Sequence, residues 1–544
     1  MKISLVSASV GGGAGKAAWR LHNGLLRQNV GSTLYVKETP KQATAGVVAI
    51  HSPEVRNGLL EHAVNGKLRQ LIQPGNTLCS AMYPSAGFSF LDEIAKGELI
   101  NLHWISGFIS SEAIAYLAAL GKPIVWTLHD QNPFTGVCHY SGGCDGYLAA
   151  CAACPQMPEE KRTLPAALWA VKKKYLPLAD MTIVAPSRWM GECARNSALF
   201  QQCRVEVISN GLDLGIYAPV SQAEARQRLQ LPLHEKIVLF GAHDLQERRK
   251  GSLELLAAMK ELAKREGYAS SLRVLTFGHQ TDLLAELPLA CSTLGYVEDE
   301  SVLRDAYAVA DVVVVPSLED NLPNLMVESV AVGTPVAAFD VGGVSDVVVP
   351  GKTGFLARPG DVSALASAIQ EAIHAPSFRE TCRAWAKAHL AEERQAQAYQ
   401  KLFAELLAEK GSDSRQYFFP PVMAPEAGAL FADWLCDAAV EVQKDLEYVQ
   451  QAHKEAQEAC AWLEQEKGRL EEEKDWQENE LEQLRHIVVQ RDENIEQLSY
   501  ELHKVRSSLS WQLTKPFRVV GRCLKKIVKY MLPYYIVQKY QQRK

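Results

Sequence analysis

The chain has 544 residues, of which 47% are hydrophobic and 22% are charged, and its formal net charge is −6. A chain of this length exceeds a single hydrophobic core, so about three to four domain-sized pieces are expected. The slightly acidic balance excludes a protein that binds nucleic acid through overall positive charge, and we expect no nucleic-acid partner.

The first residues, MKISLVSASVGGG, combine a short apolar run with glycines and lack a small-residue cleavage site. They therefore predict a first strand at residues 2–8 rather than a signal peptide. No apolar run approaches the roughly 18–20 residues of a membrane-spanning helix. Twelve cysteines without a secretion signal favour reduced thiols or metal ligands over disulfides.

Strands and helices alternate along the next residues, a pattern typical of a parallel sheet covered by helices. A glycine loop at 11–15 and an amphipathic helix at 16–28 follow the first strand, with further strands expected at 34–36, 99–102, 123–128 and 181–185. The pattern restarts near residue 220, with strands expected at 236–241, 272–277, 292–295, 312–315 and 336–339. We predict an α/β protein with two Rossmann-like halves, residues 1–219 and 220–410, that face a cleft.

The glycine loop GGGAGK contains Gly12 and Gly13 but fits neither common phosphate-binding motif. A P-loop needs a first glycine where Val10 stands and a Ser or Thr where Ala17 stands, and the dinucleotide motif needs a glycine in place of Lys16. What the loop does offer is backbone N–H groups that approach a diphosphate or an acceptor closely.

The segment 311–343, DVVVVPSLEDNLPNLMVESVAVGTPVAAFDVGG, carries the strongest functional signal. Its four valines predict a buried strand, followed by an acidic loop and a helix from about Asn324. Ligands collect at the carboxyl ends of parallel strands, and there Asp320 and Glu328 lie beside a helix N-terminus that suits a phosphate. Carboxylates for sugar hydroxyls beside a phosphate cradle predict a nucleotide-sugar site.

This segment resembles the donor-binding motif of retaining glycosyltransferases of family 4, a class with the GT-B fold. That motif has two glutamates separated by seven residues, then a G-[TS]-P-V strand and a GG turn. The resemblance implies that Asp320, one methylene shorter than the usual acid, contacts the transferred sugar and that Glu328 contacts the nucleotide ribose. Amides near Asn324 and Leu325 would help to hold the leaving phosphate. Any doubly wound protein has acids near such turns, but not this full ordered pattern.

The resemblance extends to other parts of the two halves. In PIVWTLHD, His129 is similar to a family histidine that contacts the transferred sugar near the reacting carbon, with a packed histidine as the alternative; His103 is a second candidate.

Arg249 and Lys250 resemble the family's phosphate-binding cations and are expected to begin a helix that points at the cleft. The family's arginine after the first glycine is replaced by Ala242, so Arg249 is expected to substitute for it. The family uses no catalytic metal, and its last helix, within 361–410, crosses back to the first half.

Four cysteines lie in an insertion at residues 131–158: Cys138, Cys144, Cys151 and Cys154. Their spacing, C-x5-C-x6-C-x2-C, suits a tetrahedral structural zinc ion, while an iron–sulfur cluster or reduced thiols are the alternatives. The insertion resembles one found in a subset of bacterial family 4 enzymes that work on surface polysaccharides.

The last 134 residues differ in composition from the rest. Residues 411–435 are predicted to be a linker. A heptad pattern from Val442 to Leu509 predicts a coiled coil over 436–510 and a homo-oligomer, with a single solvated helix as the alternative. Residues 511–544 combine aromatic and aliphatic side chains with nine Lys and Arg. This composition predicts association with an anionic membrane surface, although a nucleic-acid-binding tail is a rival interpretation. The string from Ser508 to Pro516 resembles one that follows coiled coils in bacterial polysaccharide glycosyltransferases.

Together these features lead us to expect a retaining glycosyltransferase that takes a sugar from a nucleotide diphosphate sugar. Its acceptor would be a lipid-linked or growing saccharide of cell-surface polysaccharide biosynthesis: lipopolysaccharide, capsule or exopolysaccharide. The expected location is the cytoplasm, peripheral on the inner face of the cytoplasmic membrane. The alternatives are a catalytically weak scaffold that acts through its coiled coil, and a nucleotide-sugar epimerase or a phosphorylase of the same fold.

Overall fold

The computed structural model divides the chain into two compact units, Met1–Lys444 and Asp445–Lys544. It describes residues 1–37, 45–50, 59–72, 75–82, 90–279, 286–375, 378–410 and short segments between 451 and 490. The predicted linker (411–435) and basic tail (511–544), with much of the predicted coiled coil, lie outside the described residues.

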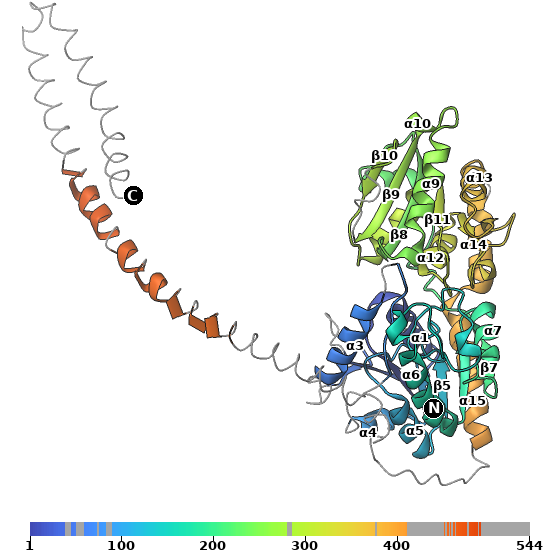
Figure 1. Cartoon of the computed structure of the whole chain (residues 1–544). Coiled ribbons are helices and arrows are strands. Elements are labelled where there is room, and N and C mark those ends of the chain that lie inside the picture. Colours follow the sequence, from blue (N-terminus) through green and yellow to red (C-terminus); the bar gives the residue numbers. More distant parts are fainter. Residues whose placement is uncertain are drawn as a thin grey trace, which may run out of the picture. The chain divides into compact units, whose positions relative to one another are not determined.

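The first half of the first unit, coloured from blue to blue-green in Figure 1, contains a seven-stranded parallel sheet. The strand order is β3-β2-β1-β4-β5-β6-β7. Its strands are β1 (Lys2–Ser7), β2 (Gly31–Val36), β3 (Val47–Ala49), β4 (Leu99–Leu102), β5 (Ile124–Thr127), β6 (Met181–Ala185) and β7 (Arg204–Val207). The helices of this half are α1 (Gly12–Arg27), α3 (Leu59–Leu71), α4 (Leu91–Ile94), α5 (Ser111–Ala119), α6 (Leu164–Tyr175) and α7 (Arg188–Asn196).

The second half contains a six-stranded parallel sheet in the order β10-β9-β8-β11-β12-β13. Its strands are β8 (Lys236–Asp244), β9 (Leu272–His279), β10 (Ala290–Thr293), β11 (Val312–Val315), β12 (Val336–Phe339) and β13 (Gly354–Ala357). Its helices are α8 (Gln222–Arg228), α9 (Ser252–Leu262), α10 (Tyr268–Ser271), α11 (Glu300–Val309), α12 (Asn324–Val332), α13 (Val362–Ile373) and α14 (Phe378–His389), followed by α15 (Glu392–Lys410). The prediction of two Rossmann-like halves is confirmed.

Strand order places the functional loops. In the first sheet β1 lies between β2 and β4, and in the second sheet β8 lies between β9 and β11. The chain therefore leaves neighbouring strands in opposite directions at these points, and such switch points open a crevice at the carboxyl ends of the strands. The loops after β1, β8 and β11 are those that the sequence singled out.

Helix α15 belongs to the second half in sequence but completes the core of the first, as predicted (Figure 1). Its Tyr399, Leu402 and Phe403 are buried in one cluster with Leu5 of β1. The Tyr399 hydroxyl also lies 2.9 Å from the Thr127 hydroxyl at the end of β5. The two halves are thus joined by packing as well as by the chain.

Several boundaries differ from the predictions. Helix α1 begins inside the glycine run, at Gly12, and β10 ends before Leu294. Arg249 and Lys250 do not begin a helix: they lie in a 3-10 turn (Arg248–Lys250), and α9 starts only after Gly251. Gly251 takes a left-handed conformation (φ +75°), which interrupts the helix before it can include the two cations.

The described segments of the second unit are helical. Two of the expected heptad core residues, Leu481 and Leu484, are exposed in the single chain, so the coiled coil stays a prediction. Within the ranges given above, no helix is both long enough and apolar enough to cross a membrane.

Candidate active site

A cavity of about 800 Å³ is lined by residues of both halves, at the carboxyl ends of the two sheets. This volume suits a small-molecule ligand. The structure brings all nine predicted catalytic and donor-binding residues to its lining: Gly12, Gly13, His129, Arg249, Lys250, Asp320, Asn324, Leu325 and Glu328.

Asp320 is a buried acid of the cavity that two cations contact. It is 4% exposed, and one of its oxygens, Oδ2, lies 2.7 Å from Lys250 Nζ and 3.1 Å from Arg249 Nη1. Burial alone would raise the pKa of this carboxyl, but the charges of Lys250 and Arg249 outweigh burial and lower it to about 2. Asp320 is therefore ionised at any physiological pH.

Two glycines allow this arrangement. A Cβ on Gly251 would lie 1.8 Å from the Pro316 carbonyl oxygen, and a Cβ on Gly342 would lie 1.8 Å from that of Asp320. Both glycines have positive φ values that other residues rarely adopt. Gly251 thus allows the turn that carries Arg249 and Lys250 to approach the loop before Asp320, and Gly342 allows its own turn to approach Asp320 itself.

Glu328 is buried, and both its oxygens have partners. Oε1 accepts from Arg20 Nη2 of α1 at 2.7 Å, and Oε2 accepts from the Tyr307 hydroxyl at 2.7 Å. Burial and the Glu328 charge raise the pKa of Tyr307 well above its usual range, so its hydroxyl stays a donor. Arg20 also lies 3.2 Å from Glu300. The acid predicted to contact ribose is thus oriented by a cation from the other half, which the sequence did not indicate.

His129 lies at the cavity wall in a chain of hydrogen bonds. Its Nε2 is 3.0 Å from Nδ1 of His103, whose Nε2 is 3.1 Å from Asn101 Oδ1. Burial lowers the pKa of His129 to about 4, despite the opposing charge of Asp130. His129 is therefore neutral near pH 7, and His103 serves to orient it.

Two helix N-termini also meet at this cavity. Helices α1 and α12 carry no acidic residue in their first turns, so their free N–H groups and dipoles favour an anion. Asn324 Nδ2 donates to the Gly13 carbonyl oxygen at 3.4 Å, which links the two ends. The site can hold a diphosphate between amides and the Arg249–Lys250 pair.

Tyr140 and Glu319 are further residues that the sequence did not single out. Arg249 Cζ lies 4.0 Å from the centroid of the Tyr140 ring, and Glu319 contacts the same insertion. Glu319 precedes the predicted acid directly, and Tyr140 stands between two of the predicted cysteines, but neither position follows a motif of its own.

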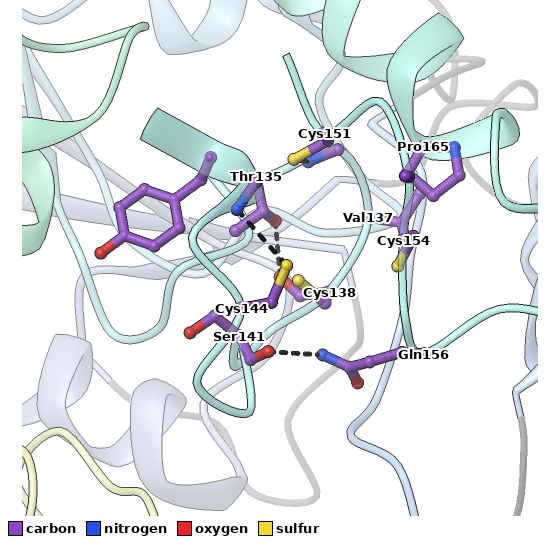
Figure 2. A pocket seen from close by; sticks show the side chains of 13 residues that line it. Thr135, Val137, Cys138, Ser141, Cys144, Cys151, Cys154, Gln156 and Pro165 are labelled. Atoms are coloured by element: carbon purple, nitrogen blue, oxygen red, sulfur yellow. Dashed lines mark hydrogen bonds between the residues drawn. The ribbon is translucent and has the colours of Figure 1, made fainter. Parts of the chain in front are cut away.

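A second, much smaller cavity of about 20 Å³ lies within the insertion, and all four predicted cysteines line it: Cys138, Cys144, Cys151 and Cys154 (Figure 2). Backbone N–H groups point at two of the sulfurs: Gly146 N lies 3.3 Å from Cys144 Sγ and Gly136 N lies 3.2 Å from Cys151 Sγ. Across the described ranges, no three His, Cys, Asp or Glu side chains already form a metal-coordinating group.

Two family descriptions match the chain: Glycosyltransferase Family 4 over residues 11–215 and Glycosyl transferases group 1 over residues 234–375. The chain is 33% identical over 353 residues to a D-inositol 3-phosphate glycosyltransferase of Thermobispora bispora, a match that covers 61% of this chain and 76% of that protein. The D-inositol 3-phosphate glycosyltransferase of Streptosporangium roseum is 32% identical over 200 residues, which cover 35% of this chain and 46% of that protein. The putative colanic acid biosynthesis glycosyl transferase WcaC of Escherichia coli is 27% identical over 227 residues, 40% of this chain and 51% of that protein.

Solved structures are similar to the first unit. Sucrose-phosphate synthase from Thermosynechococcus elongatus aligns with a TM-score of 0.53 and 21% identity, over 75% of this chain and 100% of that one. HepE of Anabaena, crystallised with UDP, aligns with a TM-score of 0.50 and 18% identity, over 74% and 100% of the two chains. At these identities the likeness concerns the fold alone.

Proposed function

This chain belongs to family 4 of the glycosyltransferases and has their GT-B fold, and from that premise we propose which reaction it catalyses. The reaction is transfer of a sugar, with retention of configuration, from a nucleotide diphosphate sugar to a lipid-linked or growing saccharide. The product would enter cell-surface polysaccharide biosynthesis.

One observation carries the donor part of this proposal. Arg249 and Lys250 both contact Oδ2 of the buried Asp320 carboxylate, in a cavity that two helix N-termini share. Cations and amides fixed at this place would stabilise the negative charge that develops on a leaving diphosphate. The carboxylate beside them would accept hydrogen bonds from the hydroxyls of the transferred sugar. HepE, which shares the fold, binds UDP in its crystal structure.

The acceptor part rests on the relatives. WcaC is named for colanic acid biosynthesis, and the insertion at 131–158 resembles that of enzymes for surface polysaccharides. The D-inositol 3-phosphate glycosyltransferases are named for a different acceptor.

Incubation of the full-length protein with UDP-, GDP- and other nucleotide sugars should identify one donor that raises the melting temperature, since a ligand bound to the folded state stabilises it by about 2.7 kcal/mol at 100 times its Kd. Transfer from that donor to a saccharide acceptor, with retention at the anomeric carbon, is the expected product. An acceptor-independent change of the donor sugar would instead indicate an epimerase. If no nucleotide sugar binds, the proposal is wrong.

We propose also that the four cysteines of the insertion hold one structural zinc ion. Their side chains line one cavity. The backbone N–H groups of Gly146 and Gly136, which point at the sulfurs of Cys144 and Cys151, would stabilise thiolates there. The buried ammonium of Lys172, which is bound to the Thr135 carbonyl oxygen at 2.8 Å, would offset part of the charge of a four-thiolate site.

Metal analysis should therefore find about one zinc per chain, as four filled cysteine ligands would hold it. Replacement of Cys151 and Cys154 by Ser should remove the zinc and lower the melting temperature together, because metal binding is coupled to folding. Cys203 lies outside the cavity, so Cys203→Ser is the control, and the protein with this substitution should keep its zinc. Folded wild-type protein without zinc would contradict this proposal and leave the enzyme proposal intact.

A further inference from the structure

The insertion at residues 131–158 belongs to the first half but contacts the acidic loop of the second. Gly142 N donates to Glu319 Oε2 at 2.8 Å, and Ser141 Oγ donates to Glu319 Oε1 at 3.3 Å. The Tyr140 hydroxyl lies 3.4 Å from Asp320 Oδ1. Three consecutive residues of the insertion thus engage two consecutive acids of the donor loop.

Tyr140 also contacts the cation that faces the proposed diphosphate. The Arg249 guanidinium lies 4.0 Å from the centroid of the Tyr140 ring, well within the range of a cation–π interaction. Arg249 Nη1 donates to the Glu319 carbonyl oxygen at 2.9 Å, and its Nε and Nη2 contact Glu247 Oε1. The ring and these oxygens leave the guanidinium little freedom to rotate.

The backbone of Tyr140 is held firmly from its own half. Gln156 Nε2 donates to the carbonyl oxygens of Tyr140 and Ser141 at 2.9 and 3.1 Å. Thr77 Oγ1 donates to the Tyr140 carbonyl oxygen at 2.9 Å, and Ser141 N donates to Gln131 Oε1 at 2.6 Å. Tyr140 itself is 9% exposed. Its ring is therefore a fixed surface against which Arg249 packs.

We propose that Tyr140 is a positioning residue for sugar transfer: it orients the Arg249 guanidinium toward the donor diphosphate across the interface of the two halves. This inference rests on the proposed function, because it assigns Arg249 to the diphosphate. It gives the insertion a role in catalysis, since the loop that carries the cysteines also presents Tyr140. The proposed phosphate site is then completed by residues of both halves.

Tyr140→Phe and Tyr140→Leu test this role in the full-length protein. The probes are UDP and GDP, each compared with UMP and GMP, together with kcat and KM for the donor found above. The Leu variant should bind the diphosphate about tenfold more weakly, with a smaller effect on the monophosphate, and should show a lower kcat. The Phe variant keeps the ring over the guanidinium and should stay within about threefold of the wild type.

Tyr147→Leu is the matched control for packing of the insertion, since Tyr147 lies in the same loop but packs on Phe134. It should lower stability without a preferential loss of diphosphate binding. If wild type binds UDP or GDP and Tyr140→Leu binds it equally well, the inference is wrong while the proposed function stands. If wild type binds no nucleoside diphosphate, including that of the donor found above, the proposed function falls with the inference.

Discussion

Asp320→Asn should lower kcat by roughly 10- to 100-fold, because a buried carboxylate that accepts hydrogen bonds from sugar hydroxyls contributes about 1.5–3 kcal/mol per bond. Affinity for the nucleoside diphosphate should not weaken. Lys250 and Arg249, which now pair with Asp320, would lose a competing anion and face the phosphates more freely. Steady-state kinetics and a separate titration with the diphosphate would resolve the two effects.

The pH dependence of this variant is a further check. With a pKa of about 2, below the usual value for Asp near 4, the native carboxylate is ionised throughout an assay between about pH 5 and 9. The ratio of wild-type to Asp320→Asn activity should therefore stay constant over that range. The folding stability that the carboxylate contributes is complete above about pH 4 and disappears only as the pH falls through about 2. Asp340→Asn, an exposed aspartate after β12, is the control. Equal kcat in Asp320→Asn and wild type would remove Asp320 from the reaction.

Glu328→Gln should reduce both stability and donor affinity. The substitution leaves the Arg20 guanidinium, which is 5% exposed, without its nearest carboxylate. Loss of one partner of a buried ion pair costs about 3–5 kcal/mol, and we expect the lower end, because Glu300 remains 3.2 Å from Arg20. Donor binding should weaken about tenfold, since a charged acceptor for ribose hydroxyls becomes neutral. Urea unfolding and donor titration measure the two quantities.

Glu300→Gln is the matched control for Glu328→Gln. It removes the longer and more exposed contact of the same arginine, so its effect on unfolding should be small and donor affinity should be unchanged. Similar losses in both variants would show that Arg20 is stabilised by the pair jointly and that Glu328 has no separate role toward the donor.

Buried elements of the fold were the most predictable from sequence. The strands at 99–102, 181–185, 312–315 and 336–339 were predicted with the observed bounds, because parallel strands covered on both faces consist largely of apolar residues. The edge strands β3, β7 and β13 were missed. Each pairs with one neighbour only. In β7, which reads RVEV, polar residues interrupt the apolar run and both termini are exposed, and β3 is only three residues long.

The site was predictable where its residues follow a spacing, as Asp320 and Glu328 do. Their orienting partners were not predictable in this way. Arg20 contacts Glu328 across 308 positions of the chain, and Gly142 contacts Glu319 across 177. Such pairs form only when the two halves come together, so no local pattern in the sequence records them.

Helix α15 has a consequence for how the protein is made. The face of the first sheet that receives Tyr399 and Phe403 is complete only when residues 392–410 are present. During translation at about 5–20 residues per second, the first half leaves the ribosome roughly 10–40 seconds before that helix. For this interval the apolar face of a nearly finished sheet is open to solvent, and a chaperone that covers it would act on the nascent chain and not on the released enzyme.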